Sequence, residues 1–487
     1  MVKTERLLGI FIFLHVAVWT LAPALMRFNL PLDTIEGTIW GSHLSFGYDK
    51  NPYLSAWLNS LAIQLESTSG LMTYLMSQLS VGVAFIAIFL LARKILPSFY
   101  ALLSVLILEG VQYFHFHAID FSDNVLELSM WSLTILFFYE AITENKLRDW
   151  LSLGLFASLS VMTKYYSALL IISLFLFLCW NKDARQFFAK KQLYLSVLLS
   201  FLIIFPHILW LFSHDFTTIH YAFARVHTKP LWMHHLSFPF QFTLEQLATI
   251  FPAFFLLLLL YIGKKPFTEK ISVSQFQKEF LFFAGIMPFI LTLLISFFMG
   301  YQLRAAWGQP LLSLWGILFI LLLKPRVSEI KIKNTMILIC FSMVLLVCVY
   351  CMMQINTKKA SSANFRGREI AETITTKWRE TYGNNLKFVA GPRWIAGNIA
   401  FYSKDHPSVY IDWDNKLSPW IDETELLKNG GIFVWDLSEF RYQAKFTYEE
   451  IKNRYPEISA PEILHFSWHR NNALTPYKIM IAFMPPK

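Results

Sequence analysis

Long runs of apolar residues dominate the first part of the chain and follow one another with only short polar breaks. A helix needs about 20 mostly apolar residues to cross the ~30 Å hydrocarbon core of a bilayer. Runs close to that length predict transmembrane helices at 7–27, 72–92, 98–115, 124–142, 192–213, 245–262, 279–299, 306–323 and 335–353. Two shorter runs, 150–163 and 166–181, flank Lys164 and predict a pair of helices that meet near one membrane face. The pattern therefore predicts about eleven spans.

The pattern changes after residue 356, where charged segments alternate with short apolar ones. The stretches LKFVAG, PSVYI, GIFVWD and YKIMIAF are typical of strands, whereas GREIAETITTKWRETYG and SEFRYQAKFTYEEIKNRY are typical of helices. We therefore predict an α-helical polytopic membrane domain over 1–356 and a soluble α/β domain over 357–487. The first exterior loop, 28–71, is long and contains an amphipathic stretch, PYLSAWLNSLAIQLES, expected to lie along the membrane surface.

Composition supports a membrane protein, because 55% of the residues are hydrophobic and the mean hydropathy is +0.45. Lys and Arg lie mainly in alternate short loops, and the basic side of a membrane protein faces the cytoplasm. The N-terminus is therefore expected in the cytoplasm and residues 357–487 outside it. The basic loops include Arg93, Lys94, Lys182, Arg185, Lys190, Lys191, Lys264, Lys265, Lys270 and Arg326. The net charge of +9 thus reports orientation and gives no reason to expect a nucleic-acid partner.

Charged side chains also gather on the exterior side, where the bias in Lys and Arg does not explain them. The segment LDTIEGTIWGSHLSFGYDKNP, directly after the first span, holds Asp33, Glu36, Asp49 and Lys50. Turns between later spans add further polar side chains on the same side: Asp120, Asp123, Lys164, Arg225, Arg304 and Trp307. Ionisable groups near a bilayer are costly unless they pair or line a wet cavity. We therefore expect one shared cavity at the exterior face.

Four short motifs occur in order within this part of the chain. They are the acidic pair of the exterior loop, then GYDKNPYL, then FSDNVLELSMW, and finally the small-residue helix GLFASLSVMTKYYSALL. As a set they resemble the GT-C superfamily of polyprenyl-phosphate-sugar transferases. In particular, they resemble the bacterial branch of the protein O-mannosyltransferase-like family, which includes the lipid A aminoarabinose and galacturonic acid transferases. The chain departs from the family at Asn51-Pro52-Tyr53, where relatives have His-Pro-Pro, and in the three-residue spacing of its two acids.

The resemblance implies an inverting glycosyltransferase with a GT-C-like fold. Such an enzyme moves a sugar from a polyprenyl-phosphate donor to lipid A, lipopolysaccharide or another envelope acceptor at the outer face of the bacterial inner membrane. The C-terminal domain would then be periplasmic, and the expected partners are the lipid-linked donor, a lipid or glycan acceptor and membrane lipids.

Transfer of this kind needs a base for the acceptor proton and positive charge on the departing phosphate. We expect Asp33 to be the base, with Glu36 as the second choice, and Lys50 to hold the donor phosphate. The matched motifs and the exterior cations supply the other expected substrate contacts: Tyr48, Asp123, Asn124, Lys164, Tyr165, Arg225, Arg304 and Trp307.

A metal site is a weaker expectation. His115, His117 and Asp120 lie on one turn and carry groups that ligate divalent cations, but alternate residues of an extended segment point to opposite sides. The four cysteines lie in or at the ends of apolar spans and indicate neither a disulfide framework nor a zinc site. A divalent cation is the one cofactor that the sequence leaves open.

Two other classes of function stay open. A flippase or transporter of a lipid-linked sugar would also need many spans and a few charges, but it predicts internal repeats and paired broken helices. The sequence shows neither pattern, and its charges are concentrated on one face. A structural partner in an envelope complex, acting through the C-terminal domain, is the third alternative.

Overall fold

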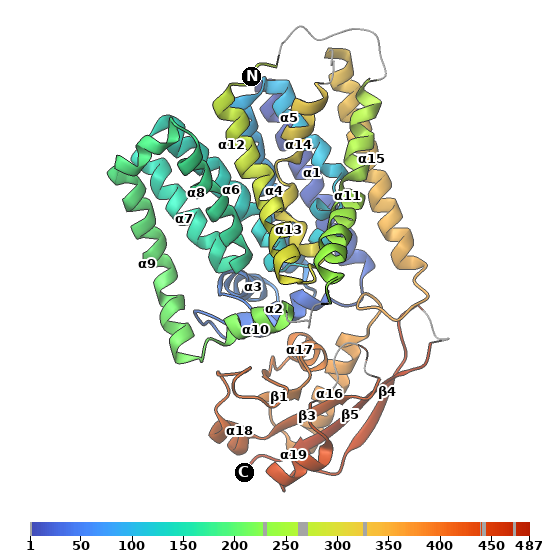
Figure 1. Ribbon diagram of the computed structural model, residues 1–487. Coiled ribbons are helices and arrows are strands. Elements are labelled where there is room, and N and C mark those ends of the chain that lie inside the picture. Colours follow the sequence, from blue (N-terminus) through green and yellow to red (C-terminus); the bar gives the residue numbers. More distant parts are fainter. Residues whose placement is uncertain are drawn as a thin grey trace.

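The apolar runs form the helices of a bundle, and the residues that follow them form a small β-sheet beyond one end of it (Figure 1). The computed structural model describes residues 2–226, 231–261, 271–324, 329–438, 440, 445–470 and 474–487. The N-terminus lies at the end of the bundle far from the sheet, and the C-terminus lies in the sheet region (Figure 1). The predicted fold class, a helical membrane protein with a C-terminal α/β part, is confirmed.

Seven helical segments among the described residues are long and apolar enough to cross a membrane. They are α1 (Val2–Met26), α4 (Leu71–Ile95), α6 (Asp123–Glu144), α9 (Lys191–Ser213), α11 (His234–Tyr261), α12 with α13 (Gln275–Gly285 and Met287–Met299) and α15 (Glu329–Ile355). Residue 262 of the predicted span 245–262 lies outside the described residues, as do Lys264, Lys265, Lys270 and Arg326.

The remaining predicted spans are bent or short. Helix α5 (Ser98–Leu106) and the 3₁₀ turns η1 (Ile107–Gly110), η2 (Gln112–Phe114) and η3 (His117–Ile119) form a segment bent by 87°. The turns η6 (Ala305–Gly308) and η7 (Pro310–Leu312) with α14 (Trp315–Leu323) are bent by 61°. Counting each bent pair as one span raises the seven to nine in the described part of the chain. The two shorter runs form α7 (Leu147–Thr163) and, after η4 (Tyr165–Ser167), α8 (Ala168–Trp180).

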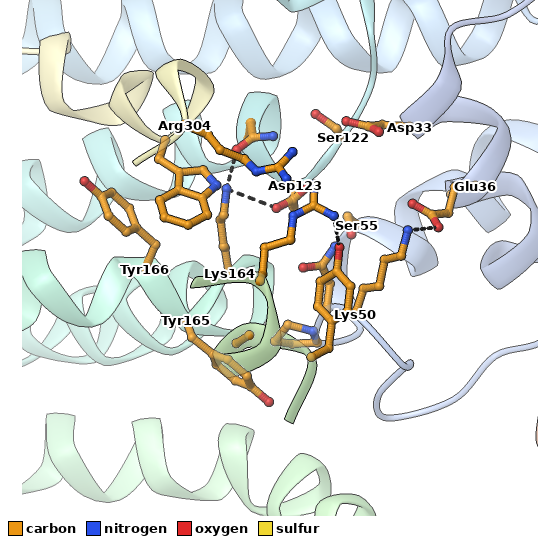
Figure 2. A pocket seen from close by; sticks show the side chains of 18 of the residues that line it. Asp33, Glu36, Lys50, Ser55, Ser122, Asp123, Lys164, Tyr165, Tyr166 and Arg304 are labelled. Atoms are coloured by element: carbon orange, nitrogen blue, oxygen red, sulfur yellow. Dashed lines mark hydrogen bonds and ion pairs between the residues drawn. The ribbon is translucent and has the colours of Figure 1, made fainter. Parts of the chain in front are cut away.

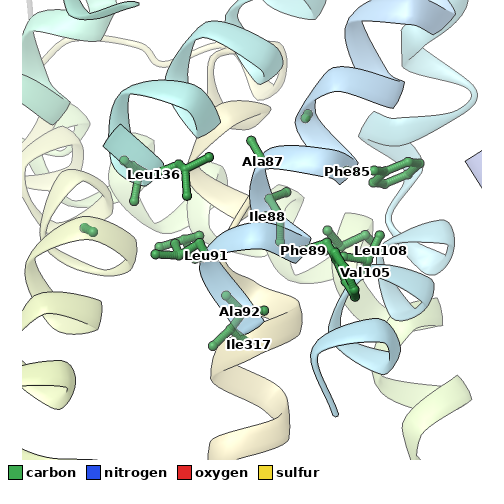
Figure 3. Packing of buried hydrophobic residues seen from close by; sticks show 14 of the residues in the cluster. Phe85, Ala87, Ile88, Phe89, Leu91, Ala92, Val105, Leu108, Leu136 and Ile317 are labelled. Carbon is green, nitrogen blue, oxygen red and sulfur yellow. The ribbon is translucent and has the colours of Figure 1, made fainter. Parts of the chain in front are cut away.

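Helix α4 lies at the centre of the bundle. The buried share of the apolar span is 67% in α4 and 78% in α6, against 22% in α9 and 17% in α15, so the last two present most of their surface to lipid. Figure 3 shows Phe85, Ile88 and Leu91 of α4 packing among side chains of α5, α6 and α14, with Ala87 and Ala92 between them. Small residues let membrane helices approach closely. This packed centre supports the exterior loops.

A layer of short helices lies between the bundle and the sheet (Figure 1). It consists of α2 (Leu32–Gly41), α3 (Leu54–Leu65) and α10 (Thr217–Val226). Helices α2 and α3 approach so closely that a Cβ atom on Gly41 would lie 2.7 Å from the backbone nitrogen of Ser60. The exterior loop is therefore a packed structure, not a solvated tail.

The sheet has five strands in the order β2-β1-β3-β5-β4. Strands β1 (Phe388–Gly391), β2 (Ser408–Ile411) and β3 (Gly431–Asp436) are parallel, and β5 (Tyr477–Met484) runs antiparallel to β3 and to β4 (Glu462–Phe466). Four helices accompany them: α16 (Gly367–Tyr382), α17 (Arg393–Tyr402), α18 (Glu423–Asn429) and α19 (Tyr448–Arg454).

A further short turn, η5 (Ala184–Ala189), joins α8 to α9 at the opposite end of the bundle.

Four of the five strands and helix α16 were predicted from the sequence. The second predicted helix is shorter, because only α19 is helical in its described part, and residues 439 and 441–444 lie outside the described residues. Helix α17 was missed because nine of its residues are buried, so the sequence RWIAGNIAFY has no polar face to mark its period. Strand β4 was missed because it lies at the sheet edge with mostly exposed side chains.

Candidate active site

A cavity of about 650 Å³ lies where the bundle meets the layer of short helices. Its wall brings together residues that are far apart in the sequence, and Figure 2 shows their side chains converging on one space. Ten of the predicted site residues line it: Asp33, Glu36, Lys50, Asp123, Asn124, Lys164, Tyr165, Arg225, Arg304 and Trp307. The expectation of one shared cavity is therefore met by the geometry.

Helix α2 carries both candidate bases. Pro31 precedes it, and the carboxylate of Asp120 accepts hydrogen bonds from two backbone N–H groups in the first turn of the helix, those of Asp33 (3.3 Å) and Thr34 (2.8 Å). The Thr34 hydroxyl donates to the same carboxylate at 2.8 Å. An acidic group is favourable at a helix N-terminus, where N–H groups lack intrahelical partners. Asp120 thus fixes the turn of α2 that presents Asp33 and Glu36 to the cavity.

Glu36 is held by two cations. Its Oε1 atom accepts hydrogen bonds from Lys50 and from Nη1 of Arg393, the second at 2.9 Å. Burial alone would raise the pKa of Glu36, but the charges of Lys50 and Arg393 outweigh it and lower the pKa. Glu36 is therefore an ionised carboxylate committed to an ion-pair network.

Asp33 has the opposite environment. Burial raises the pKa of Asp33 well above the usual range of an aspartate, and the neighbouring carboxylates Asp120, Glu36 and Asp123 add to the increase, against a smaller opposing effect of Lys50. Its backbone N–H, rather than its carboxylate, makes the bond to Asp120. A carboxylate with a raised pKa binds a proton more readily, which suits a general base.

The far wall of the cavity carries cations from several turns. Lys164 ends α7 and points into the space, where it bonds to Asn124 and lies 3.3 Å from Asp123 (Figure 2). Arg225 of α10 bonds to the Tyr221 hydroxyl and stacks over its ring at 5.5 Å. Arg304 and Trp307 come from the turn before and within η6. This wall offers positive charge opposite the carboxylates of α2.

Two of the predicted site residues, Tyr165 and Tyr48, lie in different surroundings. Tyr165 lines the cavity, and its hydroxyl lies 2.5 Å from Nε2 of His207. Tyr48 does not line it, because it is 1% exposed and its hydroxyl donates to the His43 carbonyl and accepts from the Ser45 N–H. Tyr48 shapes the exterior loop, and the structure does not bring it to the substrate space.

The weak metal candidates separate in the structure. His115 stacks on Trp19, His117 meets the edge of Tyr113, and Asp120 is occupied with the N-terminus of α2. Within the described ranges, no group of three His, Cys, Asp or Glu side chains is arranged to hold a metal ion. The set His115, His117 and Asp120 therefore does not form the site considered from the sequence.

Three residues in or beside the cavity were not predicted as site residues: Arg393, Asp49 and Tyr221. Arg393 comes from the first turn of α17, 357 residues away from Glu36. The signal that could have pointed to it is the charge of the exterior loop, where Asp33, Glu36 and Asp49 outnumber Lys50. Such an excess of buried carboxylates needs a cation from elsewhere in the chain.

Residues 50–210 match the family model of dolichyl-phosphate-mannose-protein mannosyltransferases. The segment includes Lys50, Asp123, Asn124 and Lys164, and the match confirms the resemblance predicted from the motifs. A search of curated proteins finds no match.

Among solved structures, the chain is similar to ArnT from Cupriavidus metallidurans bound to undecaprenyl phosphate. The TM-score is 0.63 at 13% sequence identity, and the similarity covers 97% of each chain. The apo state of ArnT gives a TM-score of 0.48 at 12% identity, over 99% of this chain and 98% of that one. The oligosaccharyltransferase AglB from Archaeoglobus fulgidus gives a TM-score of 0.38 at 13% identity, over 88% of this chain and 70% of that one. The first likeness shows the fold, which is that of ArnT.

Proposed function

We propose that this protein is an inverting glycosyltransferase that moves a sugar from a polyprenyl-phosphate donor to a hydroxyl group of an envelope lipid or glycan. The observation that carries the proposal is the composition of the cavity, where Asp33, with its raised pKa, faces a wall of cations. The similar ArnT structure has undecaprenyl phosphate bound, which supports a polyprenyl phosphate as the carrier.

In the proposed reaction, Asp33 removes the proton of the acceptor hydroxyl while the acceptor oxygen attacks the anomeric carbon. The bond between that carbon and the phosphate oxygen breaks in the same displacement, so the configuration inverts and polyprenyl phosphate leaves with the electron pair. A positioned base contributes about 10²–10⁴-fold to such a step. Glu36 is the weaker candidate for this role, because Lys50 and Arg393 keep it ionised and hydrogen-bonded.

The cations stabilise the charge that grows on the departing phosphate. We propose that Lys50 binds the donor phosphate and that Arg225 and Arg304 supply positive charge from the opposite wall. Lys164 is paired with Asp123 and Asn124, and this group orients the sugar hydroxyls. Tyr165 and Trp307 supply apolar faces for the sugar and the first prenyl units.

We further propose that residues 1–356 are the membrane catalytic domain and residues 357–487 a periplasmic domain, with the N-terminus in the cytoplasm of a bacterium. The cavity then opens at the outer face of the inner membrane. Lipid A, lipopolysaccharide or another envelope glycan would be within reach as the acceptor.

The test is lipid analysis of a strain that lacks the gene. The extract should accumulate a polyprenyl-phosphate monosaccharide, and its mass would identify the sugar. An envelope glycan should lose that same sugar, and expression of the wild-type chain should restore both. An unchanged lipid pool would overturn the proposal, and lipid-linked sugar trapped in the cytoplasmic leaflet would favour the flippase alternative.

A further inference from the structure

Arg393 links the C-terminal part of the chain to the cavity without lining it. The residue begins α17, directly after Pro392, and its side chain reaches across to the exterior loop. Nη1 donates to Glu36 at 2.9 Å and to Asp49 Oδ1 at 3.3 Å, and Nη2 donates to Asp49 Oδ2. A bidentate contact of this kind fixes the direction as well as the distance of the carboxylate.

Four charges form one closed network around this contact. Lys50 bonds to Glu36, Arg393 bonds to both Glu36 and Asp49, and each of the four side chains is 11% exposed or less. Two cations and two anions balance, and the nearby Asp412 has its own cation, Lys445, at 3.8 Å. Removing one buried partner leaves the remaining charges uncompensated, because water does not screen them.

The surrounding packing holds α17 against α2. A Cβ atom on Gly397 would lie 2.7 Å from Ile35 and 2.8 Å from Ile39, so the two helices approach closely at this glycine. On the other side, the Trp40 indole donates to Asp49 at 3.2 Å. The packing of α17 against α2 therefore fixes the position of Arg393, in addition to the contacts that its own side chain makes.

We propose that Arg393 is a positioning residue that completes the donor-phosphate site from the C-terminal domain, an inference that rests on the proposed function. Arg393 neutralises Asp49 and shares Glu36 with Lys50, which leaves the Lys50 ammonium able to attract a phosphate. Without Arg393, two carboxylates would compete for Lys50 and the network would carry an excess negative charge beside the phosphate. Donor binding then depends on a residue that does not touch the donor.

The experiment measures binding of undecaprenyl phosphate to the purified full-length protein in nanodiscs. Arg393→Met should raise the Kd about tenfold or more, because loss of the cation leaves an uncompensated negative charge near the phosphate in a poorly screened site. The double variant Arg393→Met with Asp49→Asn removes one positive and one negative charge, and it should bring the Kd back to within about threefold of the wild type. Arg379→Met is the matched control, since Arg379 pairs with Asp405 on the exposed side of α16 and should leave the Kd unchanged.

Each possible result either supports the inference or overturns it. If the single variant does not fold but the double variant folds and binds like the wild type, charge balance is supported. A single variant with unchanged Kd, a double variant as weak as the single one, or failure of both to fold would overturn the positioning role. If the wild type itself does not bind undecaprenyl phosphate, the proposed function fails and this inference falls with it.

Discussion

At the scale of single residues, two carboxylates one helical turn apart on α2 have opposite environments. Glu36 is surrounded by Lys50 and Arg393, whereas Asp33 is buried near Asp120 and Asp123. Environment rather than residue type therefore distinguishes the two acids, as it does for pairs of acids in enzymes. The sequence left the choice of the base open, and the different partners support Asp33 as the proposed base.

The raised pKa of Asp33 predicts how stability and activity depend on pH. The folded protein binds this proton more tightly than the unfolded chain, so stability is lost as the pH rises from the unfolded pKa, near 3.9, through the folded pKa. Asp33→Asn should therefore have a higher Tm than the wild type at neutral pH, with the difference shrinking in acid. The wild-type rate should rise with pH as Asp33 loses its proton.

Thermal unfolding of the purified protein across pH, together with initial rates, checks both statements. Asp183→Asn is a suitable control, because Asp183 is exposed at the opposite end of the bundle. A lower Tm for Asp33→Asn at neutral pH would show that the charged Asp33 is stabilised by its surroundings, contrary to the present account.

Most side chains of the candidate site could be predicted because membrane sequences keep few charges, and each one is informative. Lys164 between two short spans and Asp123 at a turn are examples. Tyr48 was misplaced because a motif does not tell whether a tyrosine faces the substrate or its own loop. Arg393 could not be predicted as a site residue, because 357 residues separate it in the sequence from Glu36, its hydrogen-bond partner.

At the scale of secondary-structure elements, α2 is fixed at both sides. Asp120 caps its N-terminus, and α17 packs on Ile35 and Ile39. The elements predicted most easily from sequence are the long spans, where an apolar run has a single interpretation. The bends at η1–η3 and η6–η7 were not predicted within the spans 98–115 and 306–323, because hydropathy does not register a change of direction.

The contact between α17 and α2 predicts a sensitive glycine. Gly397→Ala should push the helices apart, because its Cβ would lie 2.7 Å from Ile35, and overpacking of this kind costs about 1–3 kcal/mol. We expect a lower Tm and weaker binding of undecaprenyl phosphate, measured on the same samples. Gly9→Ala, where a Cβ meets nothing within 4 Å, should change neither quantity. Unchanged Tm and binding in Gly397→Ala would mean that α17 does not hold α2 in place.

At the scale of the whole molecule, the cavity lies between the bundle and the layer of short helices. The C-terminal sheet lies beyond that layer (Figure 1). The spans supply Asp123, Lys164 and Arg304, and the sheet region supplies the counter-charge for the exterior loop. The sequence separates these two parts by their patterns of apolar residues, but it contains no signal for how they dock. Where the two parts meet, Arg393 pairs with Glu36 and Asp49 of the exterior loop.

The proposed orientation predicts the result of a topology experiment. A phosphatase reporter fused after Lys487 should be active only in the periplasm, whereas a fluorescent reporter inserted in the 182–190 turn should mark the cytoplasm, because Lys182, Arg185 and Lys190 lie there. The reverse pair of results would place the cavity on the cytoplasmic side and exclude transfer at the outer face.

The most direct test of the account is the transfer rate of Asp33→Asn, with donor lipid isolated from the deletion strain and an envelope extract as acceptor. Release of polyprenyl phosphate should fall by about 10²–10⁴-fold relative to the wild type, while the Kd for the donor stays the same, because only the proton acceptor is lost. A rate near that of the wild type in Asp33→Asn would contradict the central claim that Asp33 is the base of a polyprenyl-phosphate-dependent transferase.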